Sequence, residues 1–461
     1  MLIEIAFIVL FTTMTAYAIR HYKFTWSRLY SRQKRAYQEL AGHYLPSVSI
    51  IVPMHNEEMV APHILQRLVE MDYPKENGMY EVIALNDCSE DRTGEIIDEF
   101  AEKYPFIKAV HRTETGGHGK PEAMNVALKF VHNEIIITFD ADYLPSKDCV
   151  KRLVAPFYDP EVGAVMGRVV PANSPDSLTT RLLDLERAAG YQVDQQARYN
   201  LDLIILYGGT VGGFRRDVLK RIGGWDETKL AEDTDLSFKV FLAGWKVVYV
   251  NPAEAYEEAV PTWKQRSRQL RRWAIGHIQC LFDHLIPIIK SPFLTFWQKV
   301  DGILLLGVFL IPFLMFSGWI LGLISYLFIP PAWSSFFIAI PATIAYINLG
   351  NFAMLNEVAA SAYIDGRKRA IWLLPSMLLL VVHSVWVCTV AFFEAILLHR
   401  KQREFKRNWD KTDRAGNGFL HYNNLRNNNN RNNHKNNWYK TQHNGNGIKY
   451  LNGGEKREKR K

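Results

Sequence analysis

The sequence predicts an α/β protein in which a doubly wound, mostly parallel sheet carries helices on both faces and is joined to transmembrane helices. Two observations support this class. Between residues 45 and 260, short apolar runs alternate with helical stretches, which is typical of strands and crossover helices in a parallel sheet. On either side of that region stand apolar stretches long enough to cross a bilayer. The chain of 461 residues therefore has room for one large domain and a membrane part.

The N-terminal segment, residues 1–20, is expected to be a transmembrane helix. Leu2 to Ile19 is almost wholly apolar and is followed by a cluster of basic residues that begins at Arg20. Basic residues gather on the cytoplasmic side of a membrane, so the region 45–260 is expected in the cytoplasm. A cleaved signal peptide would carry its positive charge before the apolar run. The four cysteines are dispersed, which fits a reducing compartment and argues against a disulfide or zinc framework.

Three predicted strands of the cytoplasmic region end in polar residues. The strands are Val48–Val52, Glu81–Leu85 and Ile135–Phe139. The side chains that follow them are Glu57, Asp87, and the pair Asp140 and Asp142. Because the carboxyl ends of parallel strands share one edge, where ligands bind in open α/β sheets, this pattern predicts a pocket for a nucleotide and its phosphates.

The pair Asp140 and Asp142 follows the most apolar of these strands. Two neighbouring carboxylates repel each other unless a cation lies between them, and such oxygen ligands suit Mg²⁺ or Mn²⁺ in contact with a phosphate. The alternative is an ordinary acidic turn after a buried strand. Lys120 follows a glycine-rich turn and is expected to reach a diphosphate as a point charge. The Gly-x-Gly-x-x-Gly pattern of dinucleotide-binding dehydrogenases does not follow the first strand.

The second half of the region is less regular. Residues Pro175 to Tyr199 are expected to form a long polar helix, and Trp245 to Val250 a last strand. The glycines between Gly208 and Gly213 are interpreted either as a close backbone approach to a ligand or as a plain turn. Glu232 and Asp233 open a predicted helix, where acidic residues ordinarily serve as caps and complement the helix dipole.

Residues 261–300 are expected to form interfacial helices. The run Trp263 to Trp273 mixes cations with aromatic residues and precedes an apolar-rich segment, so its arginines are expected to meet lipid head groups, a diphosphate, or both. Residues 301–398 contain three apolar stretches, Ile303–Phe328, about 332–355, and Ile371–Leu398. Three full crossings cannot leave both the basic loop 366–369 and the basic residues after Arg400 inside, so one stretch is interfacial or re-entrant.

Residues 408–461 form an Asn-rich basic tail that lacks the apolar content of a core and is expected to be disordered. The formal net charge of +8 lies largely in this tail and beside the apolar segments. Membrane-flanking charge explains it more simply than a nucleic-acid partner, which is not expected.

Taken together, these segments resemble the family-2 glycosyltransferases with the GT-A fold, specifically the membrane-embedded processive branch that contains cellulose, chitin, hyaluronan and poly-N-acetylglucosamine synthases. The match runs from about Val48 to Trp273. Asp140-Ala141-Asp142 corresponds to the family's Asp-x-Asp, and Gln269-Leu270-Arg271-Arg272-Trp273 fits Gln-x-x-Arg-Trp in full. Ala231-Glu232-Asp233 is similar to Thr-Glu-Asp with Ala in the first position, and Asn86-Asp87-Cys88-Ser89 to an Asp-Asp-Gly-Ser element with two replacements.

The resemblance implies a role for each of these residues. Asp233, with Glu232 beside it, would be catalytic as the general base, and Asp142, with Asp140, would hold Mg²⁺ or Mn²⁺. The donor would be bound by Glu57, Asp87, Lys120, Asp140, Gln269, Arg272 and Trp273, with Asp87 on the nucleotide base. Trp273 would also offer an apolar face to the acceptor sugar.

The expected function is that of an inverting glycosyltransferase of the cell membrane, multi-pass, with its catalytic domain in the cytoplasm. It would transfer sugar from a nucleotide-diphosphate sugar, with a UDP-sugar expected, to a growing β-linked polysaccharide. The alternative is non-processive transfer of one sugar to a lipid carrier or glycolipid. A nucleotide-binding membrane module without catalysis is a further alternative, but it would have no use for Asp233. The need for an accessory subunit stays open.

Overall fold

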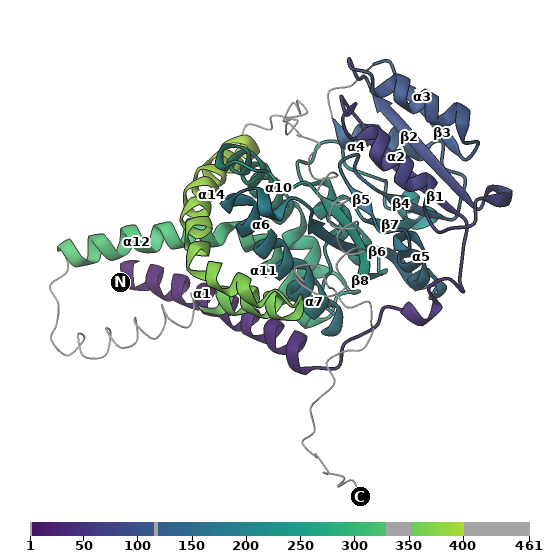
Figure 1. Cartoon of the computed structure of the whole chain (residues 1–461). Coiled ribbons are helices and arrows are strands. Elements are labelled where there is room, and N and C mark those ends of the chain that lie inside the picture. The colour runs from purple at the N-terminus through teal and green to yellow at the C-terminus, as the bar shows by residue number, and fades with distance from the viewer. Residues whose placement is uncertain (1, 115–118, 329–351, 401–461) are drawn as a thin grey trace, which may run out of the picture.

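A computed structural model describes residues 2–114, 119–328 and 352–400 (Figure 1). These residues form an eight-stranded sheet of order β3-β2-β1-β4-β7-β6-β8-β5. The strands are β1 Val48–Met54, β2 Tyr80–Asp87, β3 Ile107–Arg112, β4 Ile135–Thr138, β5 Leu144–Pro145, β6 Val162–Pro171, β7 Gly212–Arg215 and β8 Lys246–Glu257. The helices around the sheet are α2 Ala61–Val69, α3 Thr93–Lys103, α4 Lys120–Leu128, α5 Cys149–Val154, α6 Leu178–Ala188, α7 Gln196–Asn200, α8 Arg216–Arg221 and α9 Glu232–Leu242.

The first half of the sheet has the predicted doubly wound arrangement. Strands β3, β2, β1 and β4 are parallel neighbours, with Ile50 opposite Val82 on one side and opposite Ile137 on the other. Alternate residues of these strands point to two apolar cores, as the two-residue period of a strand requires. Ile50 packs with α2, α3 and α5, whereas Ile51 packs with α4 and α9. The predicted α/β class is therefore confirmed (Figure 1).

The glycine-rich stretch after Tyr207 forms strand β7, which the sequence analysis did not predict. This strand is antiparallel to both β4 and β6. A Cβ on Gly213 would lie 2.4 Å from the Ile136 carbonyl oxygen, and one on Gly212 would lie 2.6 Å from the Val165 oxygen. Glycine is required here because two neighbouring strands approach too closely for a side chain.

The predicted helix Pro175–Tyr199 is broken into pieces. Ser177 begins α6 with a capping box completed by Thr180, and a π-helical segment, Ala189–Gln195, separates α6 from α7. The wider turn carries Asp194 to α1, where it pairs with Arg20 at 3.1 Å. The last strand, β8, is also longer than predicted, because its second half continues beside the end of β6.

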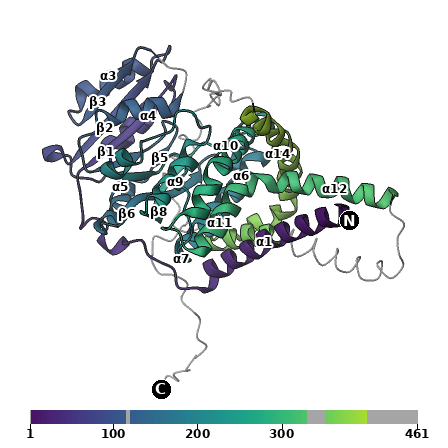
Figure 2. The ribbon, with the colours of Figure 1, turned by 180° about the vertical axis from the view of Figure 1, so that it is seen from behind.

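Among the residues that the structure describes, three helical stretches are long and apolar enough to cross a membrane: Glu4–Tyr30, Phe296–Ser325 and Lys368–Leu398. They contain α1 Leu2–Tyr30, α11 Phe296–Leu306, α12 Ile311–Phe328 and α14 Met377–Arg400. Figures 1 and 2 show α1 and α12 extending together away from the sheet. The helix α10 Trp263–Lys290 lies between the sheet and α14.

Helix α1 is longer than the predicted segment 1–20 because its second half packs on the domain. Arg20 is 6% exposed and donates to Asp301 of α11 at 2.9 Å, and Arg198 of α7 donates to the same carboxylate at 2.6 Å. Burial of these paired charges ties α1, α7 and α11 together. The predicted stretch 332–355 lies largely outside the described residues, and so does the tail 408–461.

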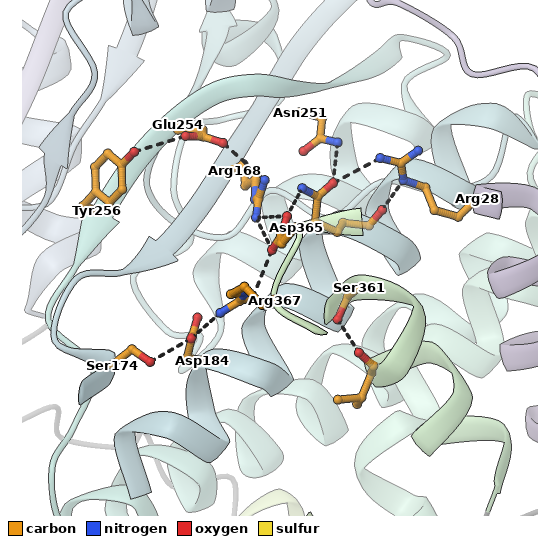
Figure 3. Close-up of polar contacts among 12 residues, drawn as sticks. Arg28, Arg168, Ser174, Asp184, Asn251, Glu254, Tyr256, Ser361, Asp365 and Arg367 are labelled. Carbon is orange, nitrogen blue, oxygen red and sulfur yellow. Dashed lines mark hydrogen bonds and ion pairs between the residues drawn. The ribbon is translucent and has the colours of Figure 1, made fainter. Parts of the chain in front are cut away.

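The loop after the helix 352–364 is docked on the sheet domain by buried charges (Figure 3). Asp365 accepts hydrogen bonds from Arg168 of β6 at 2.9 and 3.0 Å and from Gln192 at 2.6 Å. Arg367 pairs with Asp184 of α6 and donates to Asp365 at 3.0 Å. The C-terminal part of the chain is therefore joined to the same domain as the predicted site.

Candidate active site

The buried strand β4 delivers two carboxylates to the edge of the sheet. Asp140 and Asp142 follow its last residue, and Asp142 is 8% exposed. The Asp140 backbone N–H donates to the Thr210 hydroxyl at 3.0 Å, which fixes the turn against the loop before β7. Asp140 also forms an ion pair with Lys120. The predicted pair of carboxylates thus stands at the carboxyl end of the central strands.

Lys120 is the first residue of α4 and reaches across to the loop before β7. Its ammonium group donates to the Gly209 carbonyl oxygen at 2.9 Å and is half-buried. Burial opposes its charge, but the carboxylates of Asp140, Glu232 and Asp233 outweigh burial and raise the Lys120 pKa. A cation held permanently charged among acidic groups suits the binding of a diphosphate.

Asp233 lies in the first turn of α9, beside Gly209. The Thr234 backbone N–H donates to one carboxylate oxygen of Asp233 at 2.7 Å, and a Cβ on Gly209 would lie 3.2 Å from the other. Burial and the charge of Glu232 raise the pKa of Asp233 to about 6, although Thr234, Lys120 and Arg272 act in the opposite direction. A carboxylate with a pKa near the working pH suits a general base.

The Gln-x-x-Arg-Trp element lies on α10 and faces the start of α9. A Cβ on Gly276 would lie 2.6 Å from the Ala231 Cβ, so the missing side chain allows α10 to approach α9 closely. Arg272 is near enough to lower the pKa of Asp233. Gln269 accepts a hydrogen bond from Arg266 at 3.0 Å. The structure therefore brings together Lys120, Asp140, Glu232, Asp233 and Arg272 from four separate parts of the chain.

Glu57 and Asp87 form a second group at the ends of β1 and β2. The Glu57 backbone N–H donates to the Thr93 hydroxyl at 2.7 Å. Asp87 is 3% exposed and accepts from Arg112, its partner in the β2–β3 register, at 2.6 Å. Burial raises the pKa of Asp87 even though Arg112 opposes the shift. Arg112 was missed by sequence reasoning, although its position as the last residue of a strand was the signal that could have found it.

Trp273 is connected to Tyr143 of the Asp-x-Asp loop through Glu257 and Arg187, two residues that the sequence analysis did not identify. The Tyr143 hydroxyl donates to Glu257 at 2.7 Å, and Arg187 donates to the same carboxylate at 2.7 Å. The Arg187 guanidinium lies over the Trp273 ring at 5.0 Å, and that of Arg266 lies at 5.3 Å. Contacts between residues so distant in sequence have no local signature, so only the fold reveals them.

The carboxylates at this edge of the sheet fit a divalent cation that also binds a phosphate. Among the described residues, no three His, Cys, Asp or Glu side chains gather in a metal-binding cluster. Mg²⁺ commonly takes only one or two protein carboxylates and fills its other positions with phosphate oxygens and water. Asp140 and Asp142, just after a short, buried strand, supply carboxylates of that kind, and Lys120 is paired with Asp140, where it suits the charge of a phosphate.

A comparison with protein-family models matches residues 46–276 to the model described as glycosyltransferase like family 2. The chain is 36% identical over 248 residues to the probable glycosyltransferase YdaM of Bacillus subtilis. It is 33% identical over 267 residues to the beta-monoglucosyldiacylglycerol synthase of Trichormus variabilis. The matched parts are 53% and 57% of this chain, and they span 59% and 55% of those relatives' own lengths.

Among solved structures, the chain is similar to a mannosyltransferase from Pyrobaculum calidifontis in complex with GDP-Man and Mn²⁺. The TM-score is 0.53 at 22% identity, with 79% of this chain and 98% of that chain covered. This similarity supports the fold.

The sheet, its acidic rim and these matches define a glycosyltransferase with the GT-A fold. The family model covers just over half of the chain, and the chain belongs to glycosyltransferase family 2.

Proposed function

We propose that this protein transfers a single sugar from a nucleotide-diphosphate sugar to a lipid acceptor at a membrane surface. The observation that carries the proposal is the position of α10, which presents Arg272 to Asp233 and packs its opposite face on the apolar helix α14. An acceptor hydroxyl held at the bilayer surface could approach Asp233 along this helix. The named glycolipid synthases among the relatives support a lipid acceptor.

The proposed catalytic base is Asp233. Its carboxylate takes the proton of the acceptor hydroxyl while that oxygen attacks the anomeric carbon on the face opposite the leaving nucleotide, giving inversion. Thr234 and Gly209 hold the carboxylate in place. Lys120 and Arg272 stabilise the negative charge that develops on the leaving diphosphate. Glu57, Asp87 and Gln269 are proposed to bind the rest of the donor, as the family resemblance implies.

We propose that Asp142, with Asp140, holds the divalent cation. When bound, Mg²⁺ or Mn²⁺ supplies positive charge to the leaving diphosphate. Deep burial of the strand before these residues keeps their position fixed. With at least α1 and α12 as membrane helices, the protein is proposed to be an integral protein of the cell membrane with its catalytic domain in the cytoplasm.

A second candidate function is processive synthesis of a β-linked polysaccharide. The complete Gln-x-x-Arg-Trp element favours it, because the resemblance associates that element with polymer synthases. Here Trp273 lies beneath the guanidiniums of Arg187 and Arg266. A ring engaged in this way has less surface for stacking on a polymer, so we place lipid transfer first.

The deciding experiment supplies purified protein with Mg²⁺ or Mn²⁺, diacylglycerol vesicles and a series of radiolabelled nucleotide sugars. We expect the label from one donor in a small, lipid-extractable product. Label in a high-mass polymer, formed with or without diacylglycerol, would replace lipid transfer with processive synthesis. No turnover of any donor by a folded sample would contradict both candidates.

A further inference from the structure

The third apolar helix, α14, differs from α1 and α12 in what it contacts. The Tyr17 hydroxyl of α1 donates to the Leu304 carbonyl oxygen of α11 at 2.6 Å. A Cβ on Gly318 of α12 would lie 3.9 Å from the Leu10 side chain of α1. Helix α1 therefore runs beside the chain from α11 into α12. Figures 1 and 2 show these two helices extending together away from the sheet domain. Helix α14 does not extend with them and runs across their base.

Helix α14 instead follows α10. The Ser267 hydroxyl and the His383 ring lie 2.7 Å apart, and Arg271 donates to Glu394 at 2.6 and 2.9 Å. Beside these polar contacts, apolar residues of the two helices form one core: Leu270, Ala274, Ile275 and Ile278 with Val387, Cys388, Ala391 and Ala395. His383 and Glu394 are separated by about 16 Å along the helix, so the middle of α14 lies beside α10.

The depth of α10 limits where α14 can lie. Arg272 of α10 acts on Asp233, and Arg266 forms an ion pair with Glu186 at 2.7 Å. Arg272 and Asp233 belong to the proposed site for a water-soluble nucleotide sugar, on which this step rests, and charged side chains such as those of Arg266 and Glu186 are costly inside hydrocarbon. Since α10 lies outside the hydrocarbon, the stretch of α14 beside it cannot pass through the bilayer.

The opposite face of α14 is an exposed apolar stripe. Its residues recur every three or four positions, the spacing of one helix face, and are Leu378, Val382, Trp386, Val390, Phe393 and Leu397. The stripe reaches the base of α12, where the ring of Phe393 meets that of Phe313 edge to face, with centroids 5.7 Å apart. This continuity with a candidate membrane span identifies the bilayer as the occupant of the stripe.

We propose that α14 lies in the plane of the membrane surface, with its apolar stripe in the acyl chains, and does not cross. The C-terminal end of α14 then stays on the side of the catalytic domain. The contact of His21 with Glu357, at 2.5 Å, already places the helix 352–364 beside the domain-facing half of α1. The basic residues 367–369 and Arg400 thus share the side of the catalytic domain, in agreement with the positive-inside rule.

This placement goes beyond the proposed function and depends on no particular substrate. It is tested by the depth of three exposed positions on α14, Leu379, Trp386 and Phe393, each changed to cysteine in the full chain and labelled with bimane. The labelled proteins are placed in phosphatidylcholine vesicles whose acyl chains carry bromine near the glycerol end or near the methyl end. Glu95→Cys on the exposed face of α3 is the control and is expected to show no quenching.

An in-plane helix gives similar quenching at the three positions, stronger with bromine near the glycerol end. A crossing helix gives the strongest quenching by deep bromine at position 386 and weaker quenching at the other two, which would overturn the proposal. Absence of quenching at all three, with disulfide formation between two copies at position 386, would make a second copy the occupant and would also overturn it.

A second measurement needs no change in α14. The full chain carries a reporter at its C-terminus and a cysteine at position 95. Right-side-out and inverted vesicles are treated with a membrane-impermeant maleimide, which labels the cysteine, or with a protease, which removes the reporter. We expect both to react in the same vesicle orientation. Reaction in opposite orientations would overturn the in-plane placement whatever the donor, acceptor or activity of the protein.

Discussion

Asp233 is poised by residues that come from three separate parts of the chain. Burial and the charge of Glu232 raise the pKa of Asp233, whereas the Thr234 N–H, Lys120 and Arg272 lower it. This balance of burial and of like and unlike charges would suit the carboxylate to the proposed role of accepting a proton near neutral pH.

Replacing Asp233 by Asn should remove proton acceptance while keeping the shape of the site. We expect sugar transfer to fall at least about a hundredfold, the lower range for loss of general base help. Donor binding, measured by calorimetry with the nucleotide sugar, should be retained. Asp217→Asn, at an exposed aspartate of α8, is the matched control and should leave transfer unchanged. Near-normal transfer by Asp233→Asn would refute the assignment.

The pH dependence of transfer should report the same carboxylate. Asp233 must be ionised to accept a proton, and its pKa is raised to about 6. We therefore expect kcat/KM to fall about tenfold for each pH unit below this pKa and to level off above it. In Glu232→Gln the like charge is absent, so the inflection should move to lower pH. An inflection that stays in place in this variant would show that another group controls the profile.

At the scale of elements, close approach of strands and helices positions the site. Strand β7 fits between β4 and β6 because Gly212 and Gly213 carry no side chains, and α10 reaches α9 because Gly276 carries none. The loop before β7 binds Lys120 through the Gly209 carbonyl oxygen and Asp140 through the Thr210 hydroxyl, and it leads directly into β7. Errors in this packing should therefore disturb both stability and the site.

Gly213→Ala tests this requirement. Its Cβ would lie 2.4 Å from the Ile136 oxygen, so the strands must separate, and we expect a loss of about 1–3 kcal/mol in stability. Thermal unfolding in detergent measures the change. Gly190→Ala is the control, because no atom lies within 4 Å of the new Cβ. Equal melting temperatures for the two variants would contradict the packing argument.

At the scale of the whole molecule, buried charges join the C-terminal part of the described chain to the sheet domain (Figure 3). Arg168 and Asp365 are 5% and 6% exposed and come from positions far apart in the sequence. Such a pair is costly to form and still more costly to break, since the remaining partner is left buried with its charge.

Asp365→Asn should weaken this junction. We expect destabilisation of about 3–5 kcal/mol, because Arg168 loses the charge of its partner. Limited proteolysis and thermal unfolding of the full chain should show earlier release of the segment after residue 352. Glu95→Gln breaks the exposed pair with Arg92 and should change stability by less than about 0.5 kcal/mol. A similar effect of the two changes would show that the junction contributes little.

The sequence alone determined the α/β class, the strands of the first half of the domain, and the family. These are local properties, since strand periodicity and contiguous motifs such as Asp140-Ala141-Asp142 and Gln269 to Trp273 can be recognised without knowing what they contact. The roles of the individual site residues were also predicted from those motifs, and they remain predictions.

Only the tertiary structure decided how these pieces meet. Three features join residues that have no local signature in the sequence. They are the pairing of strand β7, the ion pair of Arg112 with Asp87, and the contacts that lead from Tyr143 through Glu257 and Arg187 to Trp273. The apolar composition of α14 is equally compatible with crossing a membrane and with lying on one, because composition sets the preference for lipid but not the direction of the helix. Its contacts with α10 supply that direction, and contacts between distant residues exist only in the folded chain.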